Sequence, residues 1–148
     1  VTFESELHLT DIGDVATLDV DWGLVASSTA NSRLDMDHAD AVSLALFHMD
    51  GNSANILAQS DNDVTDVAPV DTTIDNDVTA LAYKKFKVIC RPSGVCELWI
   101  NGVRALAATV FAVATTAILA GTINIEKPSD DTTAVLRFKN FRVCGAAA

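Results

Sequence analysis

The chain has 148 residues, with 20 Asp and Glu against 10 Lys and Arg, which gives a formal net charge of −10. Its apolar fraction of 49% excludes wholesale disorder, and its length suits one domain over residues 1–148. The charges are unevenly placed: residues 1–83 contain 16 acids and one base, whereas residues 84–148 contain nine bases and four acids. The acidic half would repel a nucleic acid backbone, so we expect no nucleic acid partner.

Neither the first residues nor the apolar stretches predict export or membrane insertion. Residues 1–14 lack the basic start and the apolar segment of a signal peptide. The uncharged residues 105–125 approach the length of a membrane span but are rich in Ala and Thr, so we expect core strands joined by an apolar loop. The odd count of three cysteines favours an intracellular protein over a disulfide framework.

The N-terminal half predicts strands. Residues 2–9 and 17–22 alternate between apolar and polar side chains, as half-buried strands do. Residues 42–49 are apolar at both parities, which indicates a central strand covered on both faces, followed by a turn at residues 50–53 and a return strand. The Asp-rich residues 61–79 include a proline, so we expect mostly loop with a short strand near residues 70–74.

Two turns fix the register of the strands in the C-terminal half. Residues 92–94 (Pro-Ser-Gly) suit a three-residue hairpin loop, and Asn101-Gly102 suits a two-residue type I′ turn. The register of the first hairpin then predicts a core face of three apolar cross-strand pairs. These pairs are Cys90 with Cys96, Val88 with Leu98, and Phe86 with Ile100.

The opposite face of this hairpin carries the residues that we expect to bind a partner. Lys87 and Arg104 should flank Trp99 on its two neighbouring strands, an arrangement suited to a cation–π contact, while Ile89 faces Glu97. Aromatic and Arg side chains are enriched at interface centres. We therefore predict a partner-binding surface of Trp99, Lys87, Arg104 and Glu97, with the uncharged residues 105–121 as a further contact. The alternative is that Trp99 is an exposed aromatic side chain packed by its cross-strand neighbours.

The last strands are expected at residues 121–127 and 132–144. A bulge near Lys139 and Asn140 would turn the apolar side chains on both sides of it inward. Nine or more short strands with few helix signals predict an all-β fold, an antiparallel two-sheet β-sandwich of the jelly-roll kind.

Two segments resemble a known superfamily. FKVICRPSGVCELWINGVRAL (residues 86–106) is similar to the strand, short turn, strand, Asn-Gly, strand pattern of concanavalin A-like jelly rolls, laminin-G-like domains included, and INIEKPSDDTTAVLRFKNFRV (residues 123–143) resembles their last two strands. Variants of this pattern are common in tailed-phage structural proteins. The resemblance implies a jelly roll whose concave face and loops are available to ligands or partners, and it identifies a fold without an activity.

No arrangement of side chains predicts catalysis. Glucanases of the superfamily carry Glu-x-Asp-x-Glu on one strand face, and the nearest match, Asp19-x-Asp21, lacks both glutamates, while Glu97 stands alone. We expect a non-enzymatic protein, with Asp19 and Asp21 alternating on a solvent face. His8 and His48 fall on strands and are expected to be exposed or to pack with their hydrogen bonds satisfied.

Calcium is the one cofactor that the sequence leaves open. Asp61, Asp63 and Asp66 place oxygen ligands as a calcium loop would, but the glycine and the glutamate of an EF-hand are replaced by Asp66 and Thr72, so a solvated acidic loop is the alternative. Laminin-G-like domains often bind calcium. A second candidate cluster is Asp35, Asp37, His38 and Asp40. Cys90 and Cys96 lie close enough to bridge in an oxidising setting, and inside a cell we expect two small apolar core residues.

These observations favour a structural role in a virus particle. We predict a capsid decoration or cement protein on the capsid surface, assembled in the host cytoplasm, whose partners are the major capsid protein and neighbouring copies of itself. The alternative is a lectin-like carbohydrate-binding module that takes a glycan, with or without calcium. Because the two halves of a jelly roll interleave across both sheets, the charge polarity of the sequence need not separate into two opposite faces.

Overall fold

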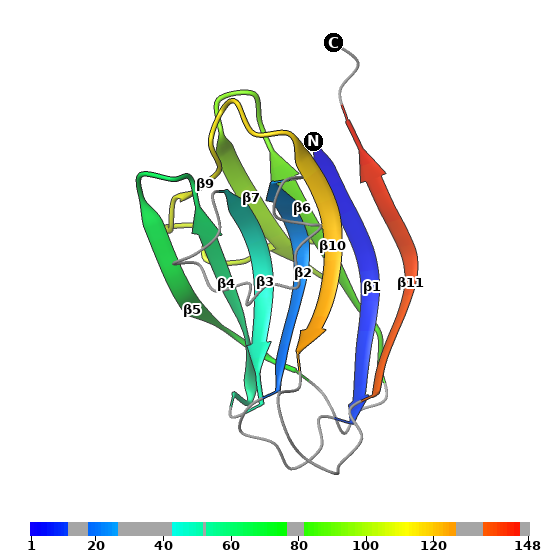
Figure 1. The fold of residues 1–148 in the computed structure, drawn as a ribbon. Helices are drawn as coiled ribbons and strands as arrows, with labels where there is room; N and C mark the ends of the chain where they lie inside the picture. Colours follow the sequence, from blue (N-terminus) through cyan, green and yellow to red (C-terminus); the bar gives the residue numbers. More distant parts are fainter. Residues whose placement is uncertain (12–17, 27–42, 52, 77–81, 127–134, 146–148) are drawn as a thin grey trace.

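The computed structural model describes residues 1–11, 18–26, 43–51, 53–76, 82–126 and 135–145 (Figure 1). Every regular element in these ranges is a β-strand. The strands are β1 (Thr2–Asp11), β2 (Asp19–Ala26), β3 (Leu44–Asp50), β4 (Asn55–Asp61), β5 (Asp66–Asp75), β6 (Lys84–Cys90), β7 (Val95–Ile100), β8 (Val103–Arg104), β9 (Phe111–Ala112), β10 (Leu119–Glu126) and β11 (Val135–Cys144).

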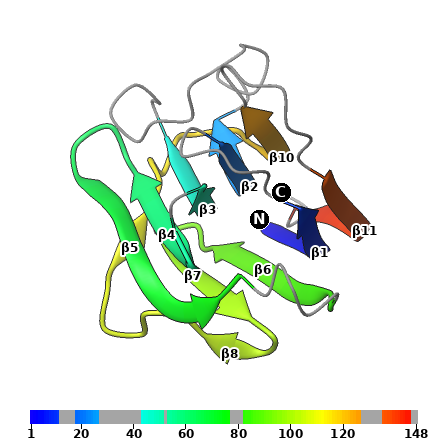
Figure 2. The ribbon, with the colours of Figure 1, turned by 90° about the horizontal axis from the view of Figure 1, so that it is seen from below.

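The strands form two antiparallel sheets that face each other, which confirms the predicted β-sandwich (Figure 2). Sheet A has the order β11-β1-β6-β7-β8, with β9 paired to β7, and sheet B has the order β10-β2-β3-β4-β5. The first strand lies between β11 and β6, so the two ends of the chain meet in sheet A (Figure 1). Among the described residues, no helix is long and apolar enough to cross a membrane.

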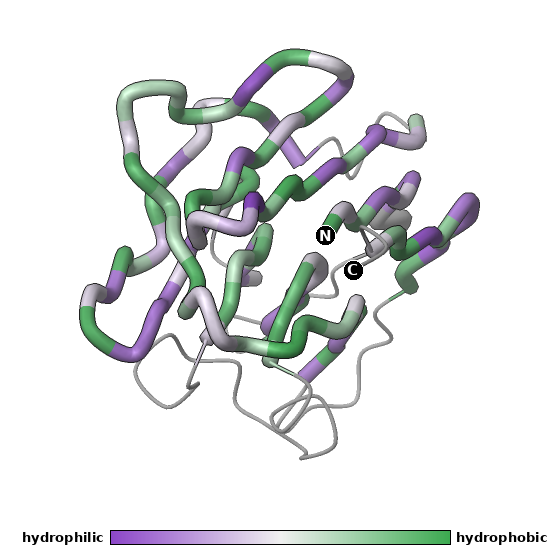
Figure 3. The backbone as a smooth tube through the Cα atoms, turned by 90° about the horizontal axis from the view of Figure 1, so that it is seen from above, coloured by the Kyte–Doolittle hydropathy of each residue, from purple (hydrophilic) through white to green (hydrophobic). Residues whose placement is uncertain are grey.

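The core lies between the sheets and follows from the alternation along each strand. Apolar and polar stretches succeed one another along the strands in Figure 3. Side chains of one parity in both sheets are buried together, with the rings of Trp22, Phe47 and Phe86 in mutual contact at 4.9–5.8 Å between centroids. The central strand β3 is also buried on its other face, where Leu44 and Leu46 are fully buried. This confirms the prediction from its apolar residues at both parities.

The two turns that were predicted in the C-terminal half are present. Asn101 and Gly102 both have positive φ (51° and 82°), as a type I′ turn requires, and Gly94 takes the left-handed position of the first hairpin (φ 83°). The register pairs Cys90 with Cys96, Val88 with Leu98 and Phe86 with Ile100, as expected. The structure joins Cys90 and Cys96 in a disulfide, which is the alternative that we expected for an oxidising setting. The third cysteine, Cys144, is free and exposed.

Strand β5 is longer than the sequence indicated. It spans ten residues and includes Pro69, where we expected mostly loop. The strand lies at the edge of sheet B and its pairing with β4 contains two register shifts. Proline is tolerated on an edge strand, because its missing N–H can face away from the ladder.

The predicted bulge in β11 is present at Asn140, which has a φ of 53°, opposite the register shift between Glu4 and Glu6 of β1. Phe138 then pairs with the buried Leu7, and the ring of Phe141 contacts that of the buried Phe3 at 5.4 Å. Both phenylalanines therefore point to the core side, as predicted, yet 57% and 44% of their surface stays exposed, because β11 is an edge strand.

Candidate functional site

The outer face of sheet A carries a row of five side chains that runs across five strands. Register pairs Arg142 of β11 with Glu4 of β1, Glu4 with Lys87 of β6, Lys87 with Trp99 of β7, and Trp99 with Arg104 of β8. Side chains directly opposite in antiparallel strands lie about 5 Å apart at their Cβ atoms. The structure thus brings together three of the four residues predicted to bind a partner, and adds Glu4 and Arg142 to them.

A groove of about 490 Å³ lies on this face. Its lining combines acidic, basic, amide and aromatic side chains from β1, β6, β7 and β11. The lining residues are Glu4, Ser5, Glu6, Lys85, Phe86, Lys87, Ile89, Trp99, Gly102 and Asn140. Such a mixture of one aromatic surface with a few polar groups is typical of small-molecule sites.

Trp99 supplies the aromatic surface of the groove. The side chain is half-buried, and its indole N–H is fully buried. The part of Trp99 that faces the groove is therefore carbon. The predicted cation–π contact at Trp99 is not formed: in the described part of the chain the cation–π contact is that of Lys139 with Tyr83, 4.1 Å from Nζ to the ring centroid.

Lys87 is directed to an acid instead. Its Nζ lies 2.9 Å from Oε1 of Glu4, whose Oε2 accepts a hydrogen bond from Arg142. The neighbouring Glu6 accepts a hydrogen bond from the Asn140 amide at 2.7 Å and pairs with Lys139 at 3.3 Å. The hydrogen bond from Lys87 holds the pKa of Glu4 below its ordinary value, and the one from Asn140 does the same for Glu6. Both carboxylates in the groove are ionised and already engaged.

Glu97, the fourth predicted residue, lies on the same outer face but outside the groove lining. It pairs with Ile89 across the strands, and its carboxylate accepts a hydrogen bond from Arg91 at 3.0 Å. This hydrogen bond lowers the pKa of Glu97. Glu97 is best described as a partner of Arg91 at the border of the site.

The two sheets differ sharply in charge. The strands of sheet A contain seven Lys and Arg against four Asp and Glu, whereas those of sheet B contain eight Asp and Glu and no Lys or Arg. The polarity of the sequence, which the sequence alone left open, is therefore kept in the fold. The strand order is the reason, because β6, β7, β8 and β11 come from the basic half of the sequence and all join sheet A.

Comparisons with known proteins support the fold. No family model matches the chain, and no curated protein is significantly similar to it. The structure is similar to a carbohydrate-binding module, CBM66 from Bacillus subtilis, with a TM-score of 0.53 and 12% identity over 95% of this chain and 71% of that one. At this identity the likeness establishes a shared β-sandwich. That neighbour is a non-catalytic kind of domain, and nothing in the comparison points to a virus particle.

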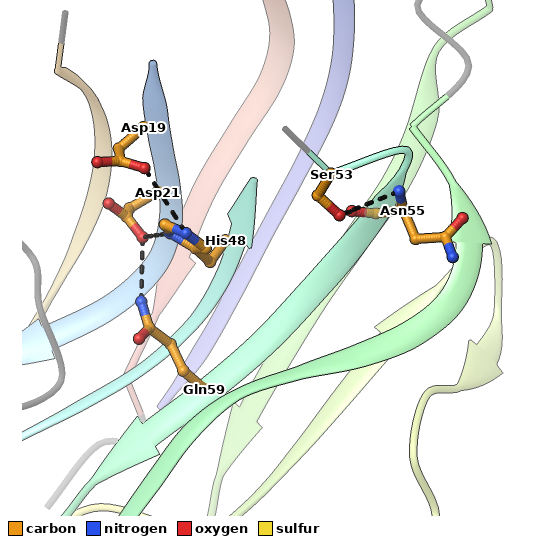
Figure 4. Close-up of polar contacts among 6 residues, drawn as sticks. All are labelled: Asp19, Asp21, His48, Ser53, Asn55 and Gln59. Carbon is orange, nitrogen blue, oxygen red and sulfur yellow. Dashed lines mark hydrogen bonds and ion pairs between the residues drawn. The ribbon is translucent and has the colours of Figure 1, made fainter. Parts of the chain in front are cut away.

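A second polar cluster lies on the outer face of sheet B, where the sequence did not predict it (Figure 4). Asp21 is only 2% exposed, and its Oδ1 lies 2.9 Å from Nδ1 of His48 and accepts a hydrogen bond from Gln59 at 3.1 Å. Asp19 lies 3.8 Å from the other ring nitrogen of His48. The expectation that Asp21 faces solvent is wrong, since this face of the central strands is buried.

This cluster and Glu97 lie on different sheets, so the carboxylates weighed as a catalytic pair do not come together.

His8 differs from its prediction. The side chain is buried, at 5% exposed, and the ring packs against that of Tyr83. Its Nε2 has no hydrogen-bond partner within the described ranges, so the ring is neither exposed nor fully hydrogen-bonded, as we had expected it to be.

The calcium candidates do not converge either. Asp61 is buried and its carboxylate accepts the backbone N–H of Asp63, and the described residues contain no group of three His, Cys, Asp or Glu placed to hold a metal ion. Backbone N–H groups of the turn between β4 and β5 donate to the side chains of Asp61 and Asn62, which indicates that these two side chains shape the turn. The second predicted cluster, Asp35, Asp37, His38 and Asp40, lies outside the described residues.

Proposed function

We propose that this protein is a carbohydrate-binding module whose ligand lies in the groove on the outer face of sheet A. The observation that carries the proposal is the placement of Trp99, whose carbon surface faces a groove of about 490 Å³ framed by charged and amide side chains. The negative face of an aromatic ring attracts the partly positive C–H groups of a sugar. The fold shared with a carbohydrate-binding module supports the same reading.

Trp99 is the aromatic side chain best placed to act as the platform. Trp22 is 3% exposed and belongs to the core, and Tyr83 is exposed but lies outside the groove lining. Around Trp99, Lys87 and Asn140 offer N–H donors, and Glu4 and Glu6 offer carboxylate oxygens. A sugar ring stacked on Trp99 would present its hydroxyl groups to these donors and acceptors.

The disulfide supports a setting that differs from the one expected from the sequence. Disulfides persist in oxidising compartments and are rare in the cytosol. The Cys90–Cys96 bridge thus favours a protein that works outside the cytoplasm, where polysaccharides are met.

The proposal is tested by a glycan array, followed by affinity measurements on the best ligand with three variants. Trp99→Ala should weaken binding at least about tenfold, because it removes the platform, and Trp99→Phe should retain most of it. Tyr83→Ala is the matched control, since it removes an exposed aromatic ring outside the groove, and should stay within about twofold. Binding should survive a chelator, because the described groove residues hold no metal-ligating cluster.

Failure of every glycan to bind would remove the proposed function. Unchanged binding in Trp99→Ala, with circular dichroism showing that this variant is folded, would place the ligand elsewhere on the protein.

The capsid decoration role stays a second candidate because of the charge separation between the sheets. A basic sheet A of one copy would attract the acidic sheet B of the next, which suits ordered contacts between neighbouring copies. Mass spectrometry of purified virus particles tests it: a decoration protein would be found at copy numbers comparable to the coat protein, and absence from particles would exclude the role.

A further inference from the structure

The cations around the groove outnumber the acids, and this excess bears on the kind of sugar that it would hold. Six Lys and Arg side chains lie on the outer face of sheet A according to strand register: Lys85, Lys87, Arg104, Arg137, Lys139 and Arg142. The acids on the same face are three, namely Glu4, Glu6 and Glu97. In a chain with a net charge of −10, one outer face is thus positive.

Each acid on this face already has its cation. Glu4 is held by Lys87 and Arg142, Glu6 by Lys139, and Glu97 by Arg91. Within the described ranges, Lys85 and Arg104 form no ion pair, and they lie next to the groove on different strands. Lys85 lines the groove directly, and Arg104 is the cross-strand partner of Trp99.

We propose that the groove selects acidic glycans, in which a sugar ring stacks on Trp99 and its carboxylate or sulfate group is bound by Arg104 or Lys85. This inference rests on the proposed function. The guanidinium of Arg104 can form paired hydrogen bonds with either anion, and its position directly opposite Trp99 puts it within reach of a substituent on the stacked ring. A neutral sugar would leave both cations without a partner.

The same cations fit nucleic acid poorly. Duplex DNA carries about one negative charge per 1.7 Å of its axis, whereas three of the six cations on this face are already paired with acids. A polysaccharide with one acidic group per sugar matches a pair of separated cations better.

The test compares polysaccharides that differ only in charge, using the full chain and isothermal titration calorimetry. Polygalacturonate is compared with its methyl ester, and dextran sulfate with dextran, so that the carboxylate and sulfate sources are separated; single-stranded DNA serves as a general polyanion. We expect at least one acidic form to bind about tenfold more tightly than its neutral counterpart, with an affinity that falls as salt rises.

Two variants locate the effect. Arg104→Gln should reduce binding of the acidic form about tenfold and leave any binding of the neutral form unchanged. Arg137→Gln removes a cation of the same face that lies outside the groove and forms no ion pair with the residues that the structure describes, and it should change the affinity by less than about twofold.

The possible results distinguish the two proposals. Equal binding of acidic and neutral forms, both lost in Trp99→Ala, would overturn the preference for acidic glycans and leave the carbohydrate-binding function standing. Binding of DNA as tight as that of the acidic glycan, weakened equally by Arg104→Gln and Arg137→Gln, would overturn it in favour of general polyanion attraction. Absence of binding to all four polysaccharides would overturn the preference for acidic glycans, and the glycan array would then decide separately whether the carbohydrate-binding function stands.

Discussion

The two sheets of the sandwich place their ionisable side chains in opposite ways. On the outer face of sheet A, acids and bases are mixed, partly exposed and paired at the surface around a groove. On the outer face of sheet B, Asp21 is buried with His48 and Gln59 in one hydrogen-bonded cluster. Exposure, more than the number of contacts, therefore decides whether a charged side chain contributes to ligand binding or to the stability of the fold. The exposed charges are available to a ligand, and the buried ones stabilise the fold.

The largest effect is expected from Asp21→Asn. The substitution keeps the size of the side chain but removes a buried carboxylate that serves both His48 and Gln59. Loss of one member of a buried charged network typically costs several kcal/mol, so we expect the free energy of unfolding to fall by about 3 kcal/mol. Urea denaturation measures it. A loss below about 1 kcal/mol would show that the sheet B cluster is no more important to stability than a surface ion pair.

A pH-dependent effect is expected at His48. Burial of the ring by itself lowers the pKa of His48, but the hydrogen bond and charge of Asp21, together with Asp19 and Asp50, raise it above its ordinary value of 6.5. A raised pKa in the folded state means that protonated His48 stabilises the fold, fully below pH 6.5 and less as the pH rises through the folded-state pKa.

The wild type should therefore exceed His48→Gln in stability by more at about pH 5.5 than at about pH 8.5. Urea denaturation at both pH values gives the two differences, and comparison within one pH cancels the titration of all other groups. A difference that does not change with pH would show that the cluster holds His48 neutral.

The strand register in the hairpin part of the site was predictable from the sequence for each residue, because short local turns determine it. Three residues, Pro92 to Gly94, and the pair Asn101-Gly102 allow few turn geometries, so loop length fixed the register that places Lys87, Trp99 and Arg104 in one row. Glu4 and Arg142 could not be added to that row, because they belong to strands that no short turn connects, 138 positions apart in sequence.

Burial was harder to predict than register. The alternation around Asp21 is the same whether its face meets solvent or is covered, and the strand order that buries it is a property of the whole sheet. The charge separation could not be decided from the sequence for the same reason, because it depends on which strands join which sheet.

The smallest effect on stability is expected from Glu4→Gln, the counterpart of Asp21→Asn on sheet A. Both substitutions convert a carboxylate with two partners to an amide, but the Glu4 side chain is 29% exposed and that of Asp21 3%. Surface ion pairs contribute little because water solvates the separated charges well, so the free energy of unfolding should fall by less than about 1 kcal/mol.

The same substitution should raise the affinity of the groove for an acidic ligand. With Glu4 neutral, Lys87 is released to the ligand, and polygalacturonate should bind about two- to threefold more tightly. Denaturation and calorimetry on the same preparation give both values. Equal destabilisation by the two substitutions would mean that the sheets do not differ, and weaker binding in Glu4→Gln would mean that Glu4 itself contacts the sugar.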